Sequence, residues 1–157
     1  MDVRFWDSRG TTAHSTTSAS GAQSSCVELT CQNHRLIFDA GAGLRSLGES
    51  LVKSLPVKAM ILFSQLSREH VEAFRFFMPA FMPSTELTLY GPGAEGGPNL
   101  QAVLHKQMEP PHFPVPMAAM RAKMEFRSAP PGGIIEAGPF QITPFELPQS
   151  CMGYLVE

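Results

Sequence analysis

The chain has 157 residues, of which 43% are hydrophobic and 17% charged, and its formal net charge is -2. This length suits one domain, so we expect residues 1–157 to form a single domain with a sizeable core. The near-neutral charge and the lack of a local Lys/Arg cluster predict no nucleic-acid partner. No apolar run is long enough to cross a bilayer and the N-terminus does not resemble a signal peptide, so we expect a cytoplasmic protein without membrane contact.

The three cysteines, Cys26, Cys31 and Cys151, are an odd number without tight metal-ligand spacing. They predict reduced, mostly buried thiols, as in cytoplasmic proteins, rather than a disulfide. Cys26 and Cys31 are an odd number of positions apart, so on one continuous strand they would face opposite sides of the sheet.

The first half of the chain has several strand patterns and one helix pattern. Short apolar or alternating runs predict strands over 3–6, 25–31, 35–38 and 58–63. Residues 7–25 are polar and lack periodicity, which predicts a long loop. Leucines at helical spacing predict a helix over 44–54, which Pro56 ends.

The second half alternates the two kinds of element. Helical spacing predicts helices over 68–78 and 99–108 and a short one within 114–122. Alternating residues predict strands over 86–90, 124–127, 134–137, 140–147 and 152–157. Strands that first pair locally and then alternate with helices are typical of a mixed α/β domain.

A polar cluster follows the apolar strand that ends near Phe63. It contains Ser64, Gln65, Ser67, Glu69 and His70 and leads directly into the predicted helix. A buried strand whose polar loop opens onto a helix is where α/β proteins usually place their chemistry.

Several segments occur in the order found in one family: 3–10, 24–29, 36–48, 61–70, 87–92, 107–116 and 153–157. Together they resemble the metallo-β-lactamase superfamily, specifically its hydrolase and phosphodiesterase-like branch. The resemblance implies an αββα sandwich, two mixed sheets face to face with flanking helices. It also implies that the family's later elements, with a bridging aspartate and a final histidine, are absent, so we expect a truncated sandwich.

The resemblance also locates the family's metal motif, His-x-His-x-Asp-His. It places Gln65 and Ser67 at the first two histidines, Glu69 at the aspartate and His70 at the last histidine, with Gln149 near a later histidine. A catalytic zinc usually takes three protein ligands, and a neutral amide and a hydroxyl do not replace two imidazoles. Without a metal, no hydroxide nucleophile forms near neutral pH. We therefore predict a pseudoenzyme with no catalytic residue, no metal and no cofactor.

The remaining polar groups predict a vestigial pocket. Its members are Asp39, Ser64, Gln65, Ser67, Glu69, His70 and Gln149. The first hypothesis is a protein that acts by binding, as a homodimer or with another protein that covers an open sheet face. One alternative is a metal-dependent hydrolase or phosphodiesterase with an altered or partner-completed site. Another is a sensor that binds a small, nucleotide-like ligand in the old pocket.

Two weaker features have simpler structural explanations. Glu69 and His70 are adjacent and could act as a base and an acid. We favour a role at the start of a helix, because no third group is present to orient them. Gly41 to Gly43, with Arg45 nearby, could present backbone N–H groups to an anion. A lone Gly-x-Gly more often marks a structural turn.

Overall fold

The computed structural model describes residues 1–6, 26–93 and 99–157, so the predicted loop 7–25 lies outside the described residues. The strands are β1 (Asp2–Trp6), β2 (Cys26–Cys31), β3 (His34–Phe38), β4 (Lys58–Leu62), β5 (Glu86–Pro92), β6 (Lys123–Ala129), β7 (Ile135–Ala137), β8 (Phe140–Leu147) and β9 (Cys151–Val156). The α-helices are α1 (Gly43–Leu51), α2 (Arg68–Val71) and α3 (Leu100–Lys106). Short 3-10 turns cover Val52–Ser54, Glu72–Phe76, Met78–Phe81, Met117–Ala119 and Pro148–Ser150.

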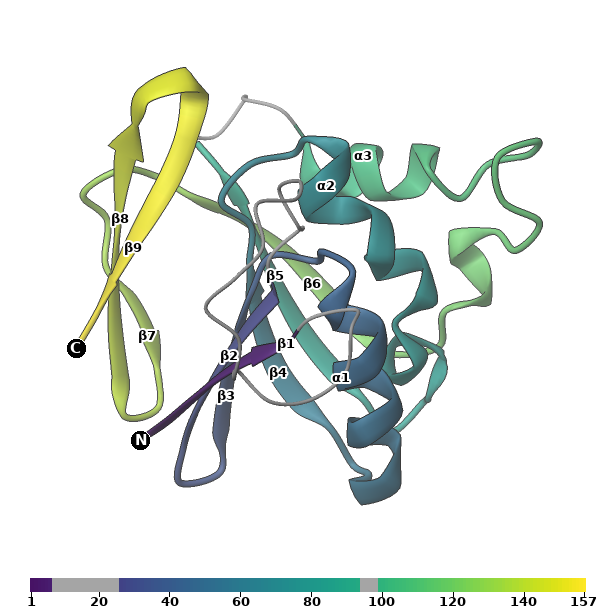
Figure 1. The fold of residues 1–157 in the computed structure, drawn as a ribbon, viewed down its shortest axis with the longest axis horizontal. Coiled ribbons are helices and arrows are strands. Elements are labelled where there is room, and N and C mark those ends of the chain that lie inside the picture. The colour runs from purple at the N-terminus through teal and green to yellow at the C-terminus, as the bar shows by residue number, and fades with distance from the viewer. Residues whose placement is uncertain (7–25, 94–98) are drawn as a thin grey trace, which may run out of the picture.

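Three layers make up the described part of the chain (Figure 1). A six-stranded sheet has the order β1-β2-β3-β4-β5-β6, antiparallel from β1 to β3 and parallel from β3 to β6. The helices cover one face of this sheet, and the antiparallel sheet β7-β8-β9 lies on the other. The predicted mixed α/β class is therefore confirmed.

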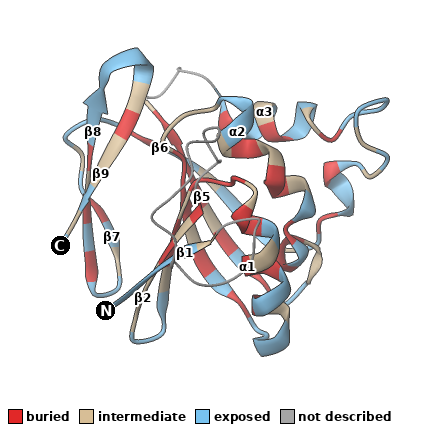
Figure 2. Cartoon of the chain, in the orientation of Figure 1, coloured by how far each residue is buried: buried red, intermediate tan, exposed pale blue. Residues whose placement is uncertain are grey.

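The larger core lies between the six-stranded sheet and the helices. Leu44 and Leu47 on α1 pack here with Ile61 on β4, and all three are fully buried. The aromatic side chains of Phe74 and Phe77, from the segment after α2, fill the same space. Buried residues accordingly line the inner sides of the sheet and the helices (Figure 2).

A second core lies between the two sheets. Leu36 and Leu62 come from the six-stranded sheet, and Phe140 and Ile142 come from β8. Because successive side chains of a strand alternate between faces, Ile61 and Leu62 enter different cores. This explains why β4 is a continuous apolar run rather than an alternating one.

The two cysteines of β2 face opposite sides, as predicted. Cys26 belongs to the helix-facing core and Cys31 packs against the core between the sheets. All three cysteines are free. Cys26 alone of them is fully buried, whereas Cys31 and Cys151 are half-buried, so the expectation of mostly buried thiols is only partly right.

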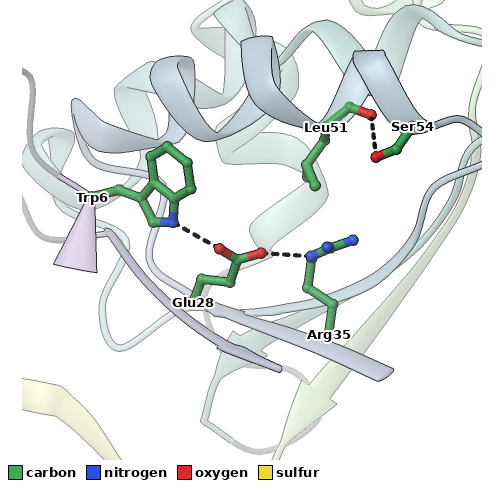
Figure 3. A network of polar contacts seen from close by, with 5 residues as sticks. All are labelled: Trp6, Glu28, Arg35, Leu51 and Ser54. Carbon is green, nitrogen blue, oxygen red and sulfur yellow. Dashed lines mark hydrogen bonds and ion pairs between the residues drawn. The ribbon is translucent and has the colours of Figure 1, made fainter. Parts of the chain in front are cut away.

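A buried carboxylate joins the first three strands on the helix-facing side (Figure 3). Glu28 on β2 accepts a hydrogen bond of 2.8 Å from Trp6 Nε1 on β1. Its other oxygen lies 2.6 Å from Nε of Arg35 on β3. Nearby, Ser54 Oγ donates to the carbonyl of Leu51 at the end of α1, 3.4 Å away.

The helix predicted over 68–78 is shorter than expected. It is α-helical only over Arg68–Val71 and continues as 3-10 turns to Phe81. Val71 leaves the helical region, with φ of -124°, and Pro79 stands near the start of a further turn. The residues between Val71 and Pro79 are rich in phenylalanine, which has only modest helix propensity. The packing of these rings in the core therefore determines the backbone conformation of this segment. No helix in the described ranges has the length and apolar character needed to cross a membrane.

Candidate functional site

The predicted pocket residues are distributed over three places in the fold. Asp39 follows β3, the segment from Ser64 to His70 follows β4 and begins α2, and Gln149 lies in the turn between β8 and β9. β3 and β4 are parallel neighbours, so their carboxyl ends meet at one edge of the sheet. The start of β9, directly after that turn, reaches the same edge, because Met152 N donates to Ser64 O at 2.7 Å.

Asp39 holds the loop that follows β4. Its carboxylate accepts two hydrogen bonds of 2.8 Å, from the backbone N and from Oγ of Ser64. Its own N–H donates to Leu62 O at 2.9 Å. Asp39 is buried and has a positive φ of 62°, a conformation that aspartate tolerates better than most residues. These contacts give Asp39 a structural role in holding the loop after β4.

His70 is in contact with two neutral side chains of the loop before α2. Gln65 Nε2 lies 3.2 Å from His70 Nε2, and Ser67 Oγ lies 2.8 Å from His70 Nδ1. Both ring nitrogens are therefore in hydrogen-bond contact with neutral side chains. An imidazole nitrogen used in this way is not free to bind an ion without displacing its partner.

Cys151 is a member of this cluster that the sequence prediction missed. Its Sγ lies 3.5 Å from Gln65 Oε1 and 3.8 Å from the main-chain oxygen of Gln149. Cys151 and Gln65 are 86 positions apart, so no local pattern could have paired them. Tyr154 was missed for the same reason, and its hydroxyl donates to Phe63 O at 2.8 Å.

Two predicted members do not converge on the cluster with their side chains. Glu69 is exposed on the first turn of α2. Gln149 is exposed, has a positive φ of 65°, and reaches Cys151 through its main-chain oxygen. The structure therefore brings together Asp39 with Ser64, and separately Gln65, Ser67 and His70 with Cys151.

The glycine loop after β3 has a structural explanation. A side chain at Gly43 would collide with the backbone of Trp6, so this position allows β1 to lie against the start of α1. Arg45 is exposed and pairs with Glu49 one turn along α1, at 3.4 Å. These contacts favour the turn over an anion site.

Burial and the Asp39 carboxylate set the electrostatics around this edge. The pKa of Tyr154 is raised by desolvation and, to a smaller extent, by Asp39. Its hydroxyl therefore stays protonated and able to donate to Phe63 O. Desolvation, with Glu28 and Asp39 as further causes, also raises the pKa of Cys26 to about 12, so this thiol is a packing group rather than a nucleophile.

The described side chains do not fit a zinc centre of the family's kind. Zinc in proteins takes three or four nitrogen, sulfur or carboxylate ligands. Within residues 1–6, 26–93 and 99–157, no group of three histidine, cysteine, aspartate or glutamate side chains lies close enough to hold an ion. His70 and Asp39 make the hydrogen bonds given above.

Two surface cavities lie away from this cluster. One of about 760 Å³ is lined by Tyr90, Arg127 and Ile134, among others, at the ends of β5 and β6. The other, of about 620 Å³, lies between the sheets near His34, Lys58 and Glu136. Neither lining includes a member of the predicted pocket, so the sensor hypothesis has no support from these cavities.

Comparisons of the sequence with family models and with curated proteins give no match. Several solved structures match in three dimensions. One is a diphosphatase from the PhnP family, with a TM-score of 0.60 and 14% identity over 98% of this chain and 61% of the other. Human tRNase Z, short form (ELAC1), gives a TM-score of 0.60 and 19% identity over 100% and 65%. The metallo-β-lactamase fold protein YhfI from Bacillus subtilis gives 0.57 and 16% over 99% and 58%.

These matches show that the chain has the metallo-β-lactamase fold, as the sequence predicted. At 14 to 19% identity they show the fold alone. The chain spans about three fifths of the length of the structures it matches.

Proposed function

We propose that this chain acts by binding and does not perform metal-dependent hydrolysis. The observation that carries the proposal is the environment of His70, whose two ring nitrogens are in contact with Gln65 and Ser67. In the family motif these two positions hold histidines. An amide and a hydroxyl supply neither the charge nor the ligand strength that lowers the pKa of a bound water.

The competing proposal is a hydrolase whose metal site is altered or completed by another chain. It draws on the fold, since the matched structures include a diphosphatase and a tRNase Z. Metal content separates the two proposals. Protein purified without chelators should contain less than a tenth of an equivalent of zinc, manganese or iron by plasma mass spectrometry. It should not hydrolyse bis(p-nitrophenyl) phosphate when these ions are added.

A His70→Ala variant is the matched control for that experiment. Stoichiometric metal that is lost in His70→Ala would overturn the proposal in favour of the hydrolase. Metal that remains in His70→Ala would be bound elsewhere and would leave the role of the cluster unchanged.

The binding surface that we propose includes β1 and the open edge of β9. Val3 and Phe5 are 51% and 78% exposed. They lie on the face toward the second sheet, because their neighbours Arg4 and Trp6 face Glu28 on the helix side. Large exposed apolar side chains that lie together on one strand are more typical of a surface that contacts a partner than of one that faces only solvent.

The edge of β9 supplies backbone groups for a partner. Gln141 and Glu157 exchange both of their hydrogen bonds, so the alternation of an antiparallel pair turns the backbone groups of Tyr154 and Val156 away from β8. On that edge Met152 N donates to Ser64 O, and no strand of the described residues pairs with it at Tyr154 and Val156. β9 has no charged residue and no proline, the usual protections of an edge strand.

Self-association is the first partner to test. A stable dimer would bury about 1,600 Å² or more in total, mostly apolar. Light scattering of the purified chain at micromolar concentration should give the mass of a dimer. A monodisperse monomer over that range would overturn self-association, and the surface would then be tested against other proteins.

A further inference from the structure

The three residues that follow β4 each make a hydrogen bond to a residue of β9. Tyr154 donates to Phe63 O at 2.8 Å, Met152 N donates to Ser64 O at 2.7 Å, and Cys151 Sγ lies 3.5 Å from Gln65 Oε1. β9 pairs with β8 along its other edge. These contacts therefore join the second sheet to the end of the six-stranded sheet, at the position of the family's metal loop.

The side-chain amide of Gln65 links β9 to His70 on α2. Its oxygen accepts from the Cys151 thiol, so its nitrogen faces His70 and donates to Nε2 at 3.2 Å. An Nε2 that accepts a hydrogen bond leaves the ring proton on Nδ1, which then donates to Ser67 Oγ at 2.8 Å. The four side chains form one chain of hydrogen bonds with a single direction.

We propose that Gln65 is a positioning residue that holds β9 against the loop before α2, in the place where relatives of this fold put a metal. The inference rests on the proposed absence of metal at His70. It goes further in that the loop between β4 and α2 sets the position of β9. The edge of β9 at Tyr154 and Val156 is part of the contact surface that we propose. Gln65 does this through two directional bonds, one to Cys151 and one to His70.

The test compares Gln65→Met, which keeps the length of the side chain and removes both bonds, with Gln101→Met at an exposed position on α3. Hydrogen–deuterium exchange should be about tenfold faster in Gln65→Met at the amide of Met152, which donates to Ser64 O, the size expected for the loss of one or two hydrogen bonds. Nitrogen NMR should show His70 protonated on Nδ1 in the wild type and a mixture of tautomers in the variant. Gln101→Met should match the wild type in both.

Unchanged exchange in β9 and an unchanged His70 tautomer in folded Gln65→Met would overturn the inference. If Gln65→Met does not fold, Cys151→Ala removes the first donor of this series of hydrogen bonds. Cys151→Ser is the matched variant that restores a donor. Equal exchange of the β9 amides in Cys151→Ala and Cys151→Ser would also overturn the inference. Metal bound at His70 in the wild type would overturn the proposed function, whereas metal-free protein with unchanged exchange would overturn the positioning role alone.

Discussion

The two faces of the six-stranded sheet are covered to different extents. On the helix side, burial extends from Trp6 and Cys26 on the first two strands to Phe126 on β6. On the other side, the second sheet covers Leu36 and the strands beyond it, while Val3 and Phe5 on β1 remain exposed. The contrast suggests that the helix-facing core supplies most of the stability and that the second face is available for contact.

The largest effect should come from the helix-facing core. Phe74→Ala should lower the free energy of unfolding by about 3 to 5 kcal/mol, because it removes a fully buried ring and leaves a cavity. Phe145→Ala, at a side chain that is 44% exposed on β8, should change it by less than about 1 kcal/mol. Phe145 lies on the outer face of β8 and is the exposed control. Urea unfolding measures both variants, and equal effects would contradict the burial of Phe74 in the helix-facing core.

Removal of the Glu28 carboxylate should have the next largest effect. Glu28→Ala should destabilise by about 2 to 3 kcal/mol, because it leaves Trp6 Nε1 and the Arg35 guanidinium without their partner. The control is Glu125→Ala, which breaks an exposed ion pair with Arg127 and should cost less than about 1 kcal/mol. A Glu28→Ala protein with wild-type stability would show that this network does not hold β1.

Alkaline pH should weaken the fold through Cys26. Its pKa is about 12 in the folded chain, whereas the ordinary value is 9.0, so the folded state retains a proton that the unfolded state releases. Stability is therefore fully present below pH 9 and falls between pH 9 and 12, by at most about 1.4 kcal/mol per pH unit. Cys26→Val should flatten this slope in urea titrations, and Tyr154→Phe should flatten it at higher pH, because its pKa is also raised. An unchanged slope in Cys26→Val would contradict the shift.

The smallest effect on stability is expected at the exposed face of β1. Phe5→Ser should change the free energy of unfolding by less than about 0.5 kcal/mol, because the side chain is 78% exposed. The same variant should shift the light-scattering mass from dimer to monomer. Ile134→Ser, at an exposed position before β7, is the control and should leave the mass unchanged. Loss of folding in Phe5→Ser would show that β1 is buried in solution.

The sequence alone determined the strands and their mixed arrangement with helices, because each depends on residues close together in the chain. Gln65, Ser67 and His70 lie within five positions, so their contact is local. Only the tertiary structure added Cys151 to that cluster and placed the Tyr154 hydroxyl against Phe63 O, because β9 reaches the end of β4 over a long separation in the chain. The alternation of side chains along a strand puts Val3 and Phe5 on one face, but whether that face is covered depends on where the second sheet packs. Most of that sheet covers β3 to β6, and β1 is left exposed.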